Sequence, residues 1–264
     1  TFSQYSFDIL KKNFKTVDTI NTDKVFFSNK MLNIIMFHLS PKLVEFYINY
    51  VLKKNIKKKY DLIFIARGDL LGKKILKYLK KKNMRLIFLC LDNPFFNLDK
   101  RKWQLTMESI NLYDLIIFQQ RTRIKYAKKL NLNYVLIPPL YNKEVHKPIN
   151  KNINKRIFKR DILLIGTWSP DRGKFAKKLI DLGLKFDIYG PHWHKDMNYN
   201  YLKNYIRQNK KMIGYRYSKL ISESKIVISF PNTHNDDDIT NKSLEIPAIG
   251  SLLLAKNTKS HREI

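Results

Sequence analysis

The sequence has 264 residues, and its 51 Lys and Arg against 22 Asp and Glu give a net charge of +29 at pH 7. A hydrophobic content of 44% and an aromatic content of 13% exclude an intrinsically disordered chain, and the length allows one large domain or two of ordinary size. The single cysteine, Cys90, excludes a disulfide scaffold and a multi-cysteine zinc site, and it fits a reducing compartment.

Basic residues exceed acidic ones in both halves of the chain, and no zinc-finger, RNP or basic-zipper pattern accompanies them. We therefore expect no nucleic-acid partner. The densest basic runs, residues 53–59 and 80–82, end two helical patterns, where lysines complement the helix dipole. The alternative interpretation is attraction to anionic lipid headgroups or acidic glycolipids.

The first elements in chain order are a helical pattern over residues 42–59 and, from residue 60, short apolar segments that alternate with amphipathic ones. This alternation predicts a parallel α/β sheet. The expected strands are 61–66, 85–91, 113–118 and 134–137, and the expected helices are 69–82, 100–110 and 121–130.

The pattern stops between residues 138 and 160, where prolines and a polar stretch indicate an interdomain linker, and then restarts. The second set of expected strands is 161–165, 185–189, 225–230 and 252–255, and the helices are 172–182, 201–208, 217–224 and 240–249. The sequence thus predicts two Rossmann-like parallel-sheet domains, residues 1–145 and 146–264, that face each other across a ligand-binding cleft. The longest apolar run, residues 31–39, is too short to span a bilayer, which predicts a soluble or peripheral protein.

Several segments, taken in order, carry a resemblance to a known family. They are IGTWSPDRG at 165–173, IYGPHW at 188–193, KIVISF at 225–230 and DDITNKSLEIPAIGSLLL at 237–254, with DNPF at 92–95, YDL at 113–115, IPPLY at 137–141 and His146 in the first half. This series resembles the CgeB-like (spore maturation protein type) glycosyltransferases, from about residue 60 to the end. The resemblance implies the GT-B fold, with an acceptor-side first domain and a nucleotide-sugar-binding second domain.

The segment from Gly166 to Arg172 predicts a diphosphate site. A strand that ends at Gly166 and turns into a helix near Arg172 would direct free backbone N–H groups toward an anion, with Thr167 between them. The resemblance places Arg172 where GT-B enzymes carry a Lys or Arg that neutralises the leaving diphosphate. The alternative is an Arg on the first turn of a surface helix, where the dipole disfavours it.

Glu245 lies in an apolar stretch, where an unpaired carboxylate is costly. The resemblance implies that it accepts hydrogen bonds from both ribose hydroxyls of the donor. The alternative is a Glu on the solvent face of a short helix. Lys242 stands where the family usually has Arg, so a cation remains but bidentate phosphate recognition is lost. With Ser243, these residues complete the expected nucleotide site of the second domain.

Asp237 falls eight residues before Glu245, where many retaining GT-B enzymes have a Glu that contacts the donor sugar, and it is one candidate catalytic residue. An acidic turn in which Asp238 or Thr240 caps the following helix explains the same residues. His234, beside this turn, is a further candidate for contact with the donor.

Asp92 is the other catalytic candidate, as a base or an acceptor contact. It follows an expected strand, as Arg67 does, and ligands bind at the carboxyl edge of parallel sheets. An Asx turn at Asp92 is the alternative.

Tyr189 and Gly190 end an expected strand, where a glycine would let a nucleobase approach the backbone. An ordinary turn explains the same residues. His192 and His194 have no evident third ligand, so no bound metal is expected.

The resemblance therefore implies a glycosyltransferase that moves a sugar from a nucleotide-sugar donor, used as co-substrate without a bound cofactor, to a glycan, lipid-linked or protein acceptor. Synthesis of a cell-surface polysaccharide or glycoconjugate, in the cytoplasm and in peripheral contact with an anionic inner membrane face, would suit it. The rival interpretations are a non-catalytic two-domain protein that binds sugars or nucleotides, and a basic nucleic-acid-associated protein. Because no strand with a glycine loop precedes residue 60, and the chain stops soon after residues 252–255, we expect a chain incomplete at both termini.

Overall fold

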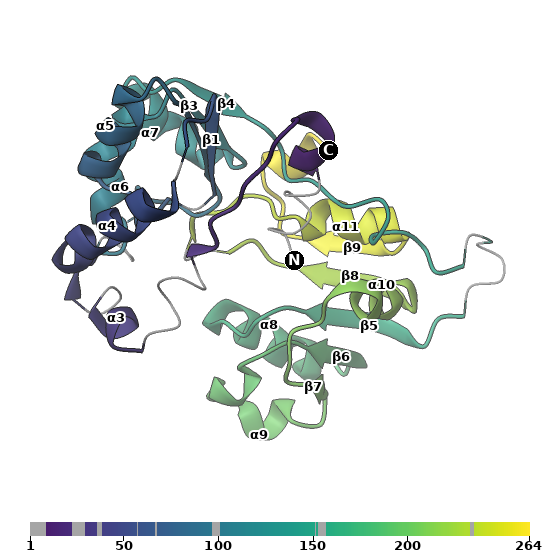
Figure 1. The fold of residues 1–264 in the computed structure, drawn as a ribbon. Helices are drawn as coiled ribbons and strands as arrows, with labels where there is room; N and C mark the ends of the chain where they lie inside the picture. Colours follow the sequence, from purple (N-terminus) through teal and green to yellow (C-terminus); the bar gives the residue numbers. More distant parts are fainter. Residues whose placement is uncertain are drawn as a thin grey trace. The chain divides into compact units, whose positions relative to one another are not determined.

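The computed structural model describes residues 9–22, 30–35, 39–56, 58–66, 68–96, 101–150, 152, 157–232 and 235–264. Arg67 and His234, which the sequence singles out, lie outside the described residues. The chain folds into two compact units (Figure 1): unit 1 is Thr1–Ile117 with Lys125–Val135, and unit 2 is Phe118–Ile124 with Leu136–Ile264. The predicted domain boundary after residue 145 thus falls inside unit 2.

Unit 1 is built on a sheet in the order β1-β2-β3-β4, with strands β1 Leu62–Ala66, β2 Arg85–Cys90, β3 Leu115–Phe118 and β4 Tyr134–Leu136. β1 and β2 run parallel, with Leu62 opposite Arg85. The helical segments are α3 Lys30–Ile34, η2 Pro41–Val44, α4 Glu45–Asn55, α5 Lys73–Lys81, α6 Gln104–Ser109, η4 Ile110–Leu112, η5 Arg121–Arg123 and α7 Ile124–Lys129.

Helix α5 shows how the sequence sets the layers of unit 1. Its sequence KKILKYLKK places Ile75, Leu76 and Leu79 on one buried face and the lysines on the other. As predicted, basic runs end the helices, because Lys53 and Lys54 lie in the last turn of α4 and Lys80 and Lys81 in the last turn of α5. Within the described ranges, no helix is both long and apolar enough to cross a membrane.

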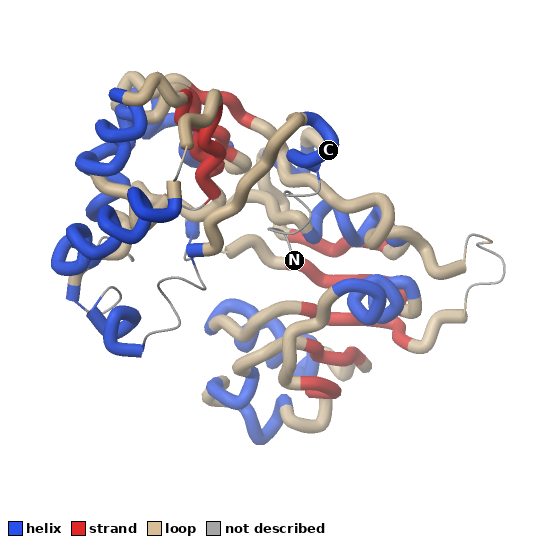
Figure 2. The backbone as a smooth tube through the Cα atoms, in the orientation of Figure 1, coloured by secondary structure: helices blue, strands red, loops and turns tan. Residues whose placement is uncertain are grey.

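Unit 2 contains a parallel sheet in the order β7-β6-β5-β8-β9 (Figure 2). The strands are β5 Arg160–Ile165, β6 Phe186–Tyr189, β7 Ile206–Gln208, β8 Ser224–Ser229 and β9 Leu252–Ala255. The helical segments are α8 Pro170–Asp181, η7 Trp193–Lys195, α9 Tyr199–Leu202, α10 Gly214–Ser222, α11 Lys242–Ile249 and η9 Ser260–Arg262.

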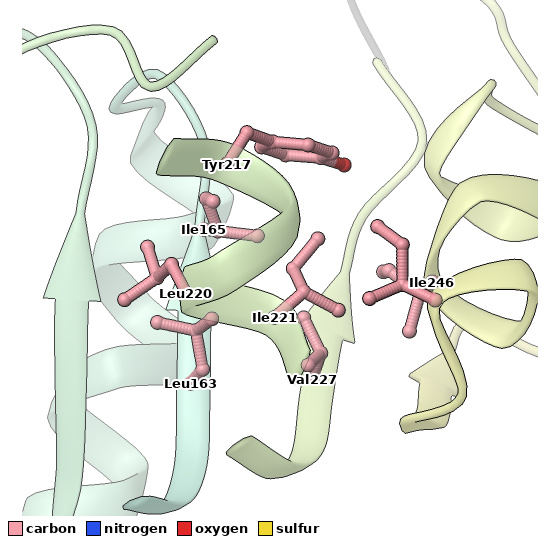
Figure 3. Packing of buried hydrophobic residues seen from close by; sticks show 8 residues of the cluster. Leu163, Ile165, Tyr217, Leu220, Ile221, Val227 and Ile246 are labelled. Carbon is pink, nitrogen blue, oxygen red and sulfur yellow. The ribbon is translucent and has the colours of Figure 1, made fainter. Parts of the chain in front are cut away.

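Side chains from alternate residues of the central strands β5 and β8 pack into two separate buried clusters. Leu163 and Val227 pack with residues of α10 and α11, including Ile221 and Ile246 (Figure 3). Leu164 and Ile228 belong to the second cluster, which includes residues of α8 and α9. Because each fully buried Leu or Ile contributes about 1.5–3 kcal/mol, these clusters hold the strand ends in place.

One predicted element is wrong. Residues 201–208 were expected to be helical, but the helix ends at Leu202 and Ile206–Gln208 form β7. Tertiary contacts override the helical pattern here, because Ile188 N–H donates to Tyr205 O at 2.8 Å and the Tyr205 ring stacks on Phe186 with 4.6 Å between centroids.

Candidate functional site

Two cationic side chains meet at the carboxyl end of β5. A Cβ atom added to Gly166 would lie 3.3 Å from Arg172 Nη1 and 3.6 Å from Lys242 Nζ, so both groups border the space that the glycine leaves. Arg172 lies on the first turn of α8, and Lys242 begins α11. The Arg172 guanidinium donates to Thr167 O and, at 3.2 Å, to Phe230 O, which fixes its position. The structure thus brings together Gly166, Thr167, Arg172 and Lys242.

Across the described residues, neither cation has a carboxylate within 4.0 Å. Both side chains are half-buried. Burial and the nearby Arg172 lower the pKa of Lys242 to about 8, although Glu245 acts in the opposite direction. Burial also lowers the pKa of Arg172. Two like charges held together without an anion are unfavourable in the free protein, and such an arrangement is typical of a site for an anionic ligand.

The start of α8 adds to this positive field. Its N-cap, Ser169, makes no side-chain capping hydrogen bond, and Pro170 occupies the first helical position. The helix N-terminus therefore contributes partial positive charge close to Arg172.

The loop after β5 is fixed against the loop after β6. Gly166 N–H donates to Tyr189 O at 2.9 Å, and Trp193 Nε1 donates to Gly166 O at 3.0 Å. A Cβ atom at Gly190, where φ is 151°, would overlap Gly166 O. The Gly166 N–H is therefore not one of the free N–H groups expected in this turn, and Gly166 provides space instead. Gly190 is explained by close approach of the two backbones, and the Tyr189 hydroxyl lies 3.3 Å from Arg160 Nη2.

Glu245 is held by a buried tyrosine. Its Oε2 accepts a hydrogen bond from Tyr217 at 2.7 Å, and its Oε1 lies 3.8 Å from His146 Nε2. Figure 3 shows the Tyr217 oxygen directed toward α11, which carries Glu245. Burial and the Glu245 charge raise the pKa of Tyr217. Only 14% of the Glu245 side chain is exposed, so the alternative of a solvent-facing Glu is wrong.

Ser243 makes internal contacts. It is buried, its hydroxyl lies 2.8 Å from His261 Nε2, and it accepts a hydrogen bond from Thr240 N–H at 3.2 Å. The other ring nitrogen of His261 lies 2.8 Å from Thr258 Oγ1, and burial lowers the pKa of His261. Ser243 therefore positions the start of α11 through its side chain.

Asp237 lies in an ion pair that sequence reasoning missed. Its Oδ1 accepts hydrogen bonds from Arg123 Nη2 and Asn235 Nδ2, each at 2.9 Å, and Arg123 is fully buried. The N-cap of α11 is Asn241, without a side-chain hydrogen bond. The alternative in which Asp238 or Thr240 caps this helix is therefore wrong.

The acidic loop, residues 235–239, is held by the segment 120–123. Gln120 Nε2 donates to Ile239 O at 2.8 Å, and Gln120 Oε1 accepts from Asp238 N–H at 3.1 Å. Thr122 Oγ1 donates to Asp236 O at 2.7 Å. These contacts fix the loop that leads into α11.

Asp92 belongs to unit 1 and is 44% exposed, with Oδ2 3.6 Å from Lys102 Nζ. The Asx turn forms at Asn93 instead, whose Oδ1 accepts from Phe95 N–H at 3.1 Å. Over the part of the chain that the structure describes, no group of three His, Cys, Asp or Glu side chains is arranged to hold a metal ion.

Comparisons with known proteins agree with this architecture. Residues 172–264 match a family model described as glycosyl transferase-like. The chain is similar to the solved structure of AviGT4, a glycosyltransferase involved in avilamycin A biosynthesis, with a TM-score of 0.51 and 12% identity over 85% of this chain and 61% of that one. It is also similar to a UDP-forming α,α-trehalose-phosphate synthase from Burkholderia xenovorans, solved with glucose-6-phosphate, with a TM-score of 0.55 and 11% identity over 83% of this chain and 65% of that one.

The chain thus spans less than two thirds of the length of either structure. No curated protein matches it. These likenesses confirm the predicted fold class, an α/β protein with two Rossmann-like parallel sheets of the GT-B type.

Proposed function

We propose that this chain is a nucleotide-sugar-dependent glycosyltransferase, similar to the CgeB-like enzymes. The observation that carries the proposal is the pair Arg172 and Lys242, which converge beside Gly166 without a carboxylate within salt-bridge distance among the described residues. The glycosyl transferase-like match from Arg172 onward supports it. The sugar would pass to a glycan, lipid-linked or protein acceptor during synthesis of a cell-surface polysaccharide or glycoconjugate.

In this proposal the donor diphosphate lies against Arg172, Lys242 and the start of α8. As the bond between sugar and phosphate breaks, negative charge grows on the leaving diphosphate, and the two cations stabilise that charge. They are already in place in the free protein, so little reorganisation is needed during the reaction. The nucleotide sugar is a co-substrate, and cationic side chains supply the charge neutralisation.

Glu245 would bind the ribose of the donor. A carboxylate can accept hydrogen bonds from two neighbouring hydroxyls, and Tyr217 holds Glu245 in one orientation. Tyr189 and Gly190 would lie toward the base, while Asp237 and Asp92 remain the candidates for contacts with the donor sugar and the acceptor. A cytoplasmic protein in peripheral contact with an anionic membrane would suit a lipid-linked acceptor.

A thermal-shift screen tests the proposal. UDP, GDP, ADP and their sugars are added separately, and at least one should raise the melting temperature, because a ligand that binds only the folded state stabilises it. Glu245→Ala should abolish this protection, whereas Tyr217→Phe, which keeps the ring, should reduce it. If no nucleotide changes the melting temperature, the proposal is wrong.

Turnover separates the enzyme from the rival, non-catalytic binder of nucleotides or sugars. A nucleotide sugar that raises the melting temperature is then incubated with the protein and candidate acceptors. Release of its nucleoside diphosphate supports transfer of the sugar. Protection without release across the acceptors tried would favour the non-catalytic protein.

A further inference from the structure

Unit 1 exposes apolar side chains along one side of η2 and α4. Leu43, Phe46 and Tyr50 are 67%, 84% and 57% exposed, and the three-, four- and seven-residue spacing among them places them on one helical face. We refer to these three residues as the apolar stripe. Ile48 and Leu52, on the opposite face of α4, are buried in the unit. Helix α4 thus carries apolar side chains on both faces, and those of the apolar stripe are exposed.

Lysines lie at one end of the apolar stripe. Lys53 and Lys54 occupy the last turn of α4, and both are exposed. The neighbouring helix α5 carries five lysines and no acidic residue in its sequence KKILKYLKK. The two helices are in contact (Figure 1), and Lys53 and Lys82 each lie 4.8 Å from the centroid of the Tyr78 ring. The basic ends of α4 and α5 therefore form one surface.

The acidic residue of α4 faces away from this surface. Glu45 Oε1 lies 2.5 Å from the position that a Cβ atom at Gly72 would take, so its carboxylate is directed at the start of α5. Its negative charge is thus directed at the N-terminus of α5. Lys42, beside Leu43, pairs with Glu108. The charge next to the apolar stripe is left positive.

We propose that this surface binds bilayers that contain anionic lipids, with the apolar stripe inserted at the level of the headgroups and the lysines of α4 and α5 against lipid phosphates. An apolar face bordered by lysines suits a membrane interface, where insertion of apolar groups and electrostatic attraction act together. A nucleic-acid surface would account for the lysines but not for an exposed Leu43 and Phe46. The inference names the surface for the membrane contact included in the proposed function; it uses unit 1 alone and does not depend on the nucleotide site of unit 2.

Co-sedimentation with lipid vesicles tests the proposal. We expect the protein to bind vesicles with about 30% phosphatidylglycerol at least about tenfold better than vesicles of phosphatidylcholine alone, and to be released by about 0.5 M NaCl. Leu43→Ser with Phe46→Ser should reduce binding about tenfold, because the inserted side chains are lost. Lys53→Glu with Lys54→Glu should reduce it to a similar extent.

Matched controls lie in unit 2, outside the surface. Ile213→Ser with Tyr215→Ser changes two side chains that are 64% and 67% exposed, and Lys203→Glu with Lys210→Glu makes the same change of charge at exposed positions. Both control variants should bind vesicles as the unchanged protein does. Melting temperatures of all variants, measured without vesicles, show whether each one is folded.

Three outcomes would overturn the proposal. The first is equal binding to both kinds of vesicle. The second is a control variant in unit 2 that weakens binding as much as the substitutions in unit 1 do. The third is a dimer in solution that dissociates when Leu43 and Phe46 are replaced. The last outcome would identify the surface as an interface between two copies. Nucleotide protection, measured on the same variants, should be unchanged, so failure here is distinguishable from failure of the proposed function.

Discussion

Cations lie near both ends of strand β5 in unit 2, but they differ in whether a carboxylate is paired with them. Toward the amino end of β5, Arg160 donates to Asp187 at 3.0 Å, Arg207 donates to the same carboxylate at 2.7 Å, and Lys159 pairs with Glu223 at 2.8 Å. Each of these three cations has an acidic partner within the unit. Such pairs hold neighbouring strands together and leave little charge for a ligand.

At the carboxyl end, Arg172 and Lys242 both lie beside Gly166, and the Arg172 guanidinium donates to the backbone carbonyls of Thr167 and Phe230 rather than to a carboxylate. The difference teaches that the net charge of +29 does not locate a site. What marks a site is a cation whose charge the fold leaves unbalanced.

Arg172→Ala should weaken binding of a nucleoside diphosphate by about tenfold to a hundredfold, because a charge-assisted hydrogen bond contributes about 1.5–3 kcal/mol. Binding of the nucleoside without phosphates should change much less. Titration calorimetry with both ligands measures the difference. Arg207→Ala, which removes an Arg that is paired with Asp187, is the matched control and should leave both affinities unchanged. Equal losses for the two variants would show that paired and unpaired cations do not differ in their effect on binding.

Asp187→Asn should lower the free energy of unfolding by about 1–3 kcal/mol, because it leaves the Arg160 and Arg207 side chains without their shared anion. Urea denaturation measures the change. Nucleotide affinity should be retained, since Asp187 lies opposite Leu163 and is not among the groups that border the space beside Gly166. Loss of affinity in a folded Asp187→Asn protein would show that the two ends are coupled.

Deprotonation of Lys242 with rising pH should have opposite effects on two quantities, the free energy of unfolding and the affinity for a diphosphate. Its pKa is about 8 in the folded protein and 10.5 for an ordinary lysine, so between these values the unfolded chain holds a proton that the folded chain lacks. The free energy of unfolding should therefore rise with pH across this window, relative to Lys242→Met. Diphosphate affinity should fall across the same window, as the ammonium loses its charge. A flat difference between the two proteins over this window would mean that Lys242 keeps an ordinary pKa.

Asp161→Asn should have the smallest effect, without a measurable change in melting temperature. Asp161 pairs with Lys225 at 2.7 Å, and the two side chains are 66% and 58% exposed, so water screens the pair. The Lys225 hydrogen bond lowers the pKa of Asp161, but this carboxylate is largely exposed to water. A clear drop in melting temperature would show that the solvent exposure of an ion pair does not predict how much the pair stabilises this protein.

The sequence was sufficient to predict most strands, because β5 and β8 are short apolar runs bounded by polar residues. It also marked Arg172 and Lys242, which the family resemblance alone assigned to one nucleotide site. It could not show that they meet, because this depends on β5 and β8 being neighbours in the sheet and on the packing of α8 and α11. The strand β7 was missed because its three residues contain a single apolar side chain, too few for a periodic pattern.

Arg123 was also missed, for a different reason. It lies in a stretch with the spacing of an ordinary surface helix, and nothing nearby indicates that it is buried. Its partner Asp237 is 114 residues further along the chain. Only the folded structure pairs them, and a sequence pattern carries no information on contacts at that separation.

The segment 118–124 has a consequence for dissecting the molecule. It belongs to unit 2, although the chain then returns to unit 1 for residues 125–135. A fragment cut at residue 136 would keep the acidic loop but lose Gln120, which bonds to Asp238 and Ile239, and Arg123, which bonds to Asp237. Unit 2 is therefore discontinuous in sequence, and isolating it intact requires a circularly permuted or two-piece chain.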